Sequence, residues 1–134
     1  MKRVLIDSNI LLDIFTEDPE WFSWSSEQLA ALSEHNSLCI NPIIYAEISS
    51  NFNNSKELDQ ALPSEILRVS LPWEAAFLAG KAFIQYKKKG GGKQSTLPDF
   101  FIGAHASTEN MLLLTRDTRR YKTYFPKVRL ATPE

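Results

Sequence analysis

The sequence predicts an α/β domain in which short parallel strands form a buried sheet and helices cover both of its faces. Two observations support this fold class. Short apolar runs alternate with longer segments of helical periodicity, which is the pattern of parallel sheets buried on both sides. A length of 134 residues and a hydrophobic content of 43% suit a single globular domain over residues 1–134, without repeats or a dividing linker.

About five short strands are expected. The first is the β-branched run before Asp7, and the most strand-like run precedes Arg116. The expected strands cover residues 4–6, 38–40, 66–69, 111–115 and 128–130.

Capping residues and helical spacing locate the helices. Ser8 or Asn9 is expected to cap a helix that starts at Ile10, and Asn41 to cap a helix that starts at Pro42. The helices after the first are expected over residues 20–34, 42–52, 56–62, 73–88 and 97–109. In the long one, the apolar residues that follow its turns are Trp73, Phe77 and Ile84. Asp117 could cap a turn into residues 118–121, and residues 87–96 are expected to form a flexible cationic loop.

The net charge of −1 conceals an asymmetry between the two parts of the chain. Residues 1–80 carry four basic and twelve acidic side chains, a balance of −8, whereas residues 81–134 carry eleven basic and four acidic ones, a balance of +7. Solvated helix faces explain such charges equally well. The alternative is a basic surface for a polyanion beside an acidic site that needs cations.

The sequence argues against a membrane or secreted protein. No apolar stretch is long enough to span a bilayer, and Asp7 and Asp13 interrupt the apolar start, so we expect no signal peptide. The single cysteine, Cys39, excludes an internal disulfide and a cysteine-built metal site. We therefore expect a cytoplasmic location.

Four acidic residues stand where a site would form. Asp7 and Asp117 follow two of the expected strands, Asp99 lies in the first turn of a helix, and Glu47 projects from the helix after the second strand. The carboxyl ends of parallel strands are the usual place for a functional site. Each acid alone has a structural explanation, as a helix cap or a partner of the helix dipole. Together they would repel one another unless cations intervened.

The chemistry of these four acids favours hard cations. Mg²⁺ and Mn²⁺ prefer oxygen ligands, whereas zinc sites usually contain histidine or cysteine, and neither is among the candidates. A carboxylate cage next to a basic surface suggests phosphodiester chemistry.

Four segments of the sequence resemble the acidic motifs of PIN-domain nucleases, in the order of that family. They are VLIDSN at residues 4–9, IYAEI at 44–48, LPDFFIGAHA at 97–106 and LLTRD at 113–117. The segment DTRRYKTYFP at residues 117–126 is similar to the VapC toxin branch of the family. The resemblance covers essentially the whole chain, although the loop at residues 87–96 is longer and more basic than the family pattern.

The resemblance implies a metal-dependent endoribonuclease in which metal-activated water attacks an RNA phosphodiester and leaves a 5′-phosphate. It assigns hydrogen-bonding support of the site to Asn9 and Thr115. It also implies a homodimer and a cognate antitoxin protein that holds the toxin inactive. The residues to which it assigns the catalytic and metal-binding role, with Mg²⁺ or Mn²⁺ as cofactor, are Asp7, Glu47, Asp99 and Asp117.

Basic and aromatic residues provide the candidate contacts with partners. Arg116 stands beside Asp117, so an ion pair between these neighbours is expected. Three large rings in residues 21–24 cannot all face one core, so at least one of them should be exposed or in an interface. The residues expected to contact RNA phosphates are Lys87, Lys88, Lys89, Lys93, Arg119 and Arg120.

Two other functions stay open at this point. A PIN-like RNA-binding or regulatory module without activity is one, and the presence of all four acids counts against it. The other is a flavodoxin-like phosphate-handling domain. A phosphatase of the haloacid type would need an aspartate where Asn9 stands, and a phosphate-binding glycine loop would follow a strand, whereas residues 90–92 follow a predicted helix.

Overall fold

A five-stranded parallel sheet forms the centre of the computed structural model, which describes residues 2–93 and 97–133. The strand order is β3-β2-β1-β4-β5, and every pair of neighbouring strands is parallel. The strands are β1 (Lys2–Ile6), β2 (Asn36–Ile40), β3 (Leu67–Arg68), β4 (Leu112–Leu114) and β5 (Leu130–Ala131). The predicted α/β class and the five short strands are therefore confirmed.

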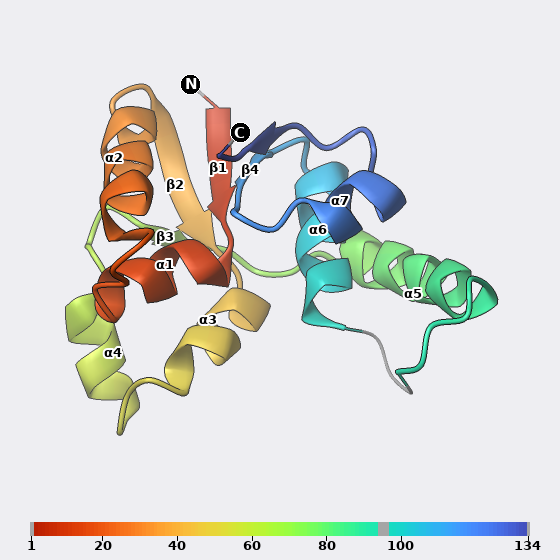
Figure 1. The fold of residues 1–134 in the computed structure, drawn as a ribbon, viewed down its shortest axis with the longest axis horizontal. Helices are drawn as coiled ribbons and strands as arrows, with labels where there is room; N and C mark the ends of the chain where they lie inside the picture. The colour runs from red at the N-terminus through yellow and green to blue at the C-terminus, as the bar shows by residue number, and fades with distance from the viewer. Residues whose placement is uncertain (1, 94–96, 134) are drawn as a thin grey trace.

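Seven helices connect the strands within the described residues. They are α1 (Ser8–Phe15), α2 (Phe22–Ser33), α3 (Pro42–Ser49), α4 (Ser55–Ala61), α5 (Trp73–Lys88), α6 (Pro98–Thr108) and α7 (Arg119–Tyr124). Figure 1 shows α1 to α4 on one side of β1 and α5 to α7 on the other. In the part of the chain that the structure describes, no helix is both long and apolar enough to cross a membrane. Residues 94–96 of the predicted cationic loop lie outside the described residues.

The central strands are buried, and their ends determine where polar residues can lie. Val4, Leu5 and Ile6 of β1 have no exposed surface, because helices cover both faces of the sheet. The Asp7 backbone N–H donates to the Leu114 carbonyl oxygen at 2.9 Å and so continues the pairing of β1 with β4 by one residue. Asp7 is thus the first polar residue after the buried part of β1, beside the end of β4.

Helix α1 begins earlier than the sequence predicted. Asp7 is its N-cap, in place of Ser8 or Asn9: its backbone is extended (φ −66°, ψ 153°) and its Oδ1 accepts from the Ser8 N–H at 2.7 Å. The predicted cap of α3 is confirmed, since Asn41 Oδ1 accepts from the Ile44 N–H at 2.9 Å. Residues 119–124 form α7, where the sequence indicated only a turn.

The orientation of α5 differs from what its apolar spacing suggests. The row formed by Trp73, Phe77 and Ile84 faces outward, with 91%, 69% and 47% of each residue exposed. The side of the helix that carries alanines is buried in the core instead, because these small side chains allow α5 to approach α6 closely. These buried residues are Ala75, Ala79 and Ala82.

Candidate functional site

Asp7 is a buried carboxylate at the end of the central strand, with only 4% of the residue exposed. Its Oδ1 accepts from the Ser8 N–H, and its Oδ2 accepts from Thr115 Oγ1 at 2.7 Å and from the Tyr121 hydroxyl at 2.9 Å. Burial raises the pKa of Asp7 to about 6, and the charge of Asp99 adds to the rise, although the three hydrogen bonds oppose it. Asp7 therefore lies where an added positive charge would stabilise its ionised form.

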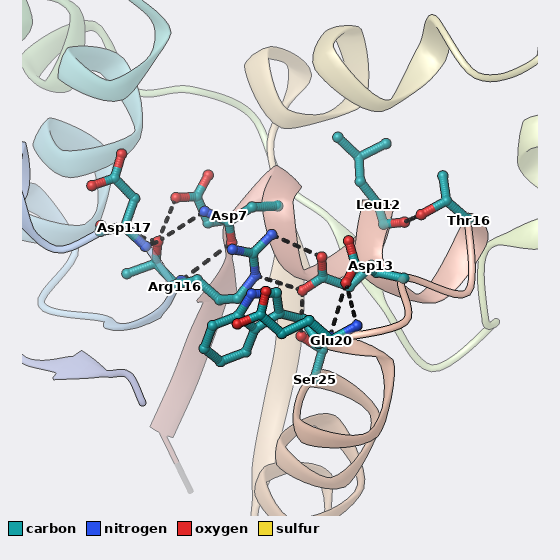
Figure 2. Close-up of polar contacts among 12 residues, drawn as sticks. Asp7, Leu12, Asp13, Thr16, Glu20, Ser25, Arg116 and Asp117 are labelled. Atoms are coloured by element: carbon teal, nitrogen blue, oxygen red, sulfur yellow. Dashed lines mark hydrogen bonds and ion pairs between the residues drawn. The ribbon is translucent and has the colours of Figure 1, made fainter. Parts of the chain in front are cut away.

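Thr115 connects Asp7 to the backbone of Asp117. Its Oγ1 donates to Asp7 and accepts from the Asp117 N–H at 3.1 Å and from Asn9 Nδ2 at 3.3 Å. Asn9 Oδ1 accepts in turn from the Arg116 N–H at 3.3 Å. Asn9 and Thr115 thus make hydrogen bonds around Asp7, while the side chain of Asp117 points away from this network and is exposed (Figure 2).

Asp99 reaches the same region from the first turn of α6. Its Oδ2 lies 3.3 Å from Arg120 Nη1, and its Oδ1 lies 3.5 Å from the Tyr121 hydroxyl that donates to Asp7. Burial raises the pKa of Asp99, Arg120 opposes the rise and the charge of Asp117 adds to it. Asp99 is therefore an electrostatic neighbour of both Asp7 and Asp117.

Glu47 joins the group through Ser8. Its Oε1 accepts from Ser8 Oγ at 2.8 Å, and the backbone N–H of the same serine donates to Asp7. Burial raises the pKa of Glu47, the Ser8 hydrogen bond lowers it, and the charge of Asp99 raises it further. All four acids predicted from the sequence thus lie in one neighbourhood, and Asp99 interacts electrostatically with each of the other three.

The four acids are neighbours, but they do not form a closed cage. Within residues 2–93 and 97–133, no three Asp, Glu, His or Cys side chains lie close enough together to hold a metal ion. The set nevertheless fits a hard divalent cation by its chemistry, because it offers only oxygen donors and the charge of Asp99 raises the pKa of both Asp7 and Glu47. Coordination by three or more of these acids would require their side chains to move closer together.

Tyr121 also belongs to the site, although no sequence pattern indicated it. Only 1% of this residue is exposed, and its hydroxyl lies between Asp7 and Asp99. Burial and the charges of Asp7 and Asp99 hold the pKa of Tyr121 well above its ordinary value, so the hydroxyl stays protonated and donates. Its position four residues after Asp117 could have indicated a place near the site, but only with a helix predicted over residues 119–124.

A hollow of about 710 Å³ opens beside the acids, between α7 and the end of α5. Its lining includes Asp117, Arg119, Arg120 and Tyr124. Lys89 Nζ lies 5.0 Å from the centre of the Tyr124 ring, which places one of the predicted RNA-binding lysines beside a lining residue. The predicted arginines therefore line a hollow next to the acids.

The described part of the cationic loop folds back on α5 and is not the free loop that the sequence suggested. Lys87 Nζ donates to the Lys93 carbonyl oxygen at 3.0 Å, and the Lys93 N–H donates to the Tyr86 hydroxyl at 3.4 Å. Gly91 lies against the Tyr86 ring, where any larger side chain would collide with it. The side chains of Lys87, Lys88, Lys89 and Lys93 are all exposed.

The expected pairing of Arg116 with Asp117 is wrong. Arg116 Nε lies 2.7 Å from Asp13 Oδ2 and Nη2 lies 2.8 Å from Asp13 Oδ1, so the pair is bidentate (Figure 2). Asp13 Oδ2 also accepts from Ser25 Oγ at 2.7 Å, and the Arg116 guanidinium lies 5.0 Å from the centre of the Trp21 ring. Arg116 therefore connects the end of β4 to α1 and α2.

The aromatic cluster at the start of α2 is divided between the core and the surface. Phe22 is 39% exposed, whereas Trp21 and Trp24 are partly buried and pack edge to face, with ring centres 6.1 Å apart. The prediction that at least one ring misses the core is confirmed.

The chain belongs to the PIN domain family, whose sequence profile matches residues 4–126. No match was found among curated proteins. VapBC2 from Rickettsia felis bound to a promoter DNA fragment is a similar solved structure, with 20% identity, 98% of this chain and 99% of that chain covered, and a TM-score of 0.75.

Two further solved structures are also similar. DNA-bound VapBC from Salmonella typhimurium has 17% identity, 98% coverage of both chains and a TM-score of 0.73. VapBC-1 from nontypeable Haemophilus influenzae has 19% identity, 97% coverage of both chains and a TM-score of 0.72. At these identities the likeness establishes the fold, and the fold agrees with the family that the acidic motifs indicated.

Proposed function

We propose that this PIN domain is a metal-dependent endoribonuclease and the toxin of a toxin–antitoxin pair. The observation that carries the proposal is the position of Asp7 and Asp99. They come from two elements far apart in the sequence, and one tyrosine hydroxyl lies within 2.9 Å of the first and 3.5 Å of the second. Glu47 and Asp117 complete the acidic neighbourhood, in which the charge of Asp99 raises the pKa of Glu47 and the charge of Asp117 raises the pKa of Asp99.

Asp7, Glu47, Asp99 and Asp117 would hold Mg²⁺ or Mn²⁺ in this proposal. The bound cation supplies positive charge and Lewis acidity toward an RNA phosphodiester. Ser8 and Thr115 orient Asp7 for metal binding by the hydrogen bonds described above. Asn9 keeps Thr115 in place, and the exposed Asp117 leaves the acidic group open to a large substrate.

The RNA strand would enter along the basic hollow beside these acids. Carboxylates repel phosphates, so a polyanion needs compensating cations close to the site. Arg119 and Arg120 line the hollow, and the lysines of residues 87–93 extend the positive charge along the end of α5. Such contacts position the RNA strand without reading its bases.

An antitoxin protein is the second proposed partner. The similar structures from Rickettsia felis and Salmonella typhimurium are VapBC proteins bound to DNA. Near the start of α2, Phe22 is exposed beside the partly buried Trp21 and Trp24, so apolar surface is available there for a partner helix. A basic side chain on such a partner would neutralise the four acids and compete with the metal.

A second copy of this chain is the third proposed partner, and we place it on the outward row of α5. Trp73, Phe77 and Ile84 form an apolar stripe of the kind that marks an interface. Helix α5 has an acidic residue, Glu74, in its first turn and Lys88 in its last turn. Two α5 helices packed antiparallel would bring the apolar rows together and set opposite charges side by side.

Cleavage of a mixed RNA pool tests the proposed activity. Wild-type protein is incubated with Mg²⁺, with Mn²⁺ and with EDTA, beside Asp99→Asn and Asp117→Asn. We expect cleavage only with metal, and at least about a hundredfold less in each variant, because the loss of one charge weakens the shared site. Asp59→Asn is the matched control, since Asp59 is exposed and pairs with Arg68.

The alternative results are informative. Wild-type rates in both site variants would show that these acids do not hold the metal. RNA binding without any cleavage in either metal would favour a PIN-like binding module.

A further inference from the structure

Tyr121 is buried like a core residue, yet its polar end faces the acids. The residue is 1% exposed and belongs to α7, which packs against α6. A tyrosine hydroxyl placed this deep needs a hydrogen-bond acceptor, because an unsatisfied buried polar group is costly. The acceptor within 2.9 Å is Asp7 Oδ2, and Asp99 Oδ1 follows at 3.5 Å. The ring could serve the core without its hydroxyl, as Phe100 and Phe125 do.

The hydroxyl completes the set of donors around Asp7. Oδ2 accepts two hydrogen bonds, from Thr115 and Tyr121, and Oδ1 accepts one, from the Ser8 backbone. An ionised carboxylate has about four acceptor positions, two on each oxygen. These three donors therefore fix the carboxylate plane and leave a free acceptor position on Oδ1.

Tyr121 and Arg120 also act together on Asp99. Arg120 lies 3.3 Å from Oδ2 of Asp99, and the Tyr121 hydroxyl lies 3.5 Å from Oδ1. Two consecutive residues of α7 thus contact Asp99 in α6, and one of them, Tyr121, also contacts Asp7 directly after β1. The hydroxyl lies within 3.5 Å of both acids, so its proton partly offsets the repulsion between their charges.

We propose that Tyr121 is a positioning residue whose hydroxyl orients Asp7 and spaces it from Asp99, so that Oδ1 of Asp7 is presented to a divalent cation. The inference rests on the proposed function, because it assigns this tyrosine a part in metal binding. Groups that orient metal-ligating carboxylates are commonly worth about 10–100-fold in metal affinity or activity.

The test is Tyr121→Phe, which removes the hydroxyl and keeps the ring. Tyr45→Phe is the matched control, because the Tyr45 hydroxyl donates to an aspartate outside the site, Asp59, at 2.9 Å. Binding of Mn²⁺ to the full chain is measured by calorimetry, and RNA affinity is measured in EDTA. In Tyr121→Phe we expect Mn²⁺ to bind about tenfold more weakly, with RNA affinity in EDTA within twofold of wild type.

Steady-state kinetics and thermal unfolding separate positioning from a general loss of structure. In Tyr121→Phe, kcat at a fixed, subsaturating Mn²⁺ concentration should fall with metal occupancy, while KM for RNA stays unchanged. The melting temperature in EDTA should stay near that of wild type. Tyr45→Phe should match wild type in Mn²⁺ binding and kcat.

Each remaining outcome overturns the proposal. Wild-type Mn²⁺ affinity in Tyr121→Phe would refute the positioning role while leaving the proposed nuclease function intact. An equal loss in Tyr45→Phe would show that the effect does not depend on the site. Absence of Mn²⁺ binding by the wild-type protein would remove the proposed function and this inference together.

Discussion

Arg116 and Asp13, which are 103 positions apart, form a bidentate ion pair one residue before the proposed site acid Asp117. Asp13 is 2% exposed, and the Arg116 side chain is 26% exposed, so the pair is largely shielded from water. The backbone N–H of Arg116 also donates to Asn9. The pair thus ties the segment that carries Thr115 and Asp117 to helix α1, and the geometry of the site depends on it.

Removing one partner of this pair should destabilise the fold strongly. In Arg116→Met the Asp13 carboxylate stays buried without its cation, so we expect a loss of about 3 kcal/mol in the free energy of unfolding. Urea denaturation measures the loss. Glu109→Gln, which removes the partner of Arg3 in an exposed pair at 2.8 Å, is the control and should cost less than about 1 kcal/mol. Equal effects of the two substitutions would mean that burial does not strengthen the Asp13 pair.

The free energy of unfolding of the metal-free protein should be larger in mild acid than it would be if all aspartates had their ordinary pKa values. The pKa of Asp7 rises from 3.8 to about 6 in the folded state, so between these values the folded protein holds a proton that the unfolded chain has lost. Stability therefore falls as pH rises from 4 through 6, by about 3 kcal/mol for this group. Glu47 and Asp99 act in the same direction.

Melting temperatures in EDTA across this pH range check the prediction. Asp7→Asn should flatten the decline and raise the melting temperature above pH 6, where the wild type carries the buried charge. Asp59→Asn should leave the decline unchanged, because the pKa of Asp59 is lowered by its hydrogen bond with Arg68. A decline that is as steep in Asp7→Asn as in the wild type would mean that Asp7 is not the titrating group.

Neutralising the lysines at the end of α5 should weaken RNA binding and its salt dependence. The variant replaces the four exposed lysines of residues 87–93 by glutamine. Each lost phosphate contact lowers the slope of log affinity against log salt by about 0.7 on a single strand. Fluorescence anisotropy in EDTA measures the slope, and Lys56→Gln on α4 is the control. An unchanged slope would place the RNA elsewhere.

Polar substitutions on the outward row of α5 should dissociate the proposed dimer. Trp73→Ser and Phe77→Ser change residues that are 91% and 69% exposed, so neither should affect folding of the monomer. A central interface aromatic contributes about 2 kcal/mol or more, so we expect monomers at concentrations where wild type is dimeric. Light scattering after gel filtration gives the mass. Leu67→Ser, at an exposed leucine on β3, should remain dimeric; dissociation of this control instead would place the interface on β3.

Local patterns in the sequence predicted most of the fold. The buried strand before Asp7 and the Asn41-Pro42 helix start were readable because their signals lie within a few residues. Two rows of residues on α5, one of large apolar side chains and one of alanines, have equally regular helical spacing. Only packing against α6 decides that the alanine row is buried. Helix α7 was missed because it has six residues and Thr118 makes no capping hydrogen bond with its side chain.

The acids of the candidate site were predicted from strand ends and motif resemblance, but their partners were not. The pairing of Arg116 with Asp13 spans 103 positions, and no local pattern favours it over the adjacent Asp117. Tyr121 lies in a segment for which the sequence indicated only a turn, so its contact with Asp7 becomes visible only in the structure. These contacts depend on how distant elements pack, which a single sequence does not encode locally.

The pairing of β1 with β4 has a consequence for synthesis of the protein. Val4 pairs with Leu112, so the two central strands meet only after synthesis has passed Leu112. Asp99, Asp117 and Tyr121 are likewise added long after Asp7. A growing chain on the ribosome therefore lacks the assembled acidic group while its own messenger RNA is still being read. The proposed ribonuclease activity would therefore be absent until synthesis has passed Tyr121.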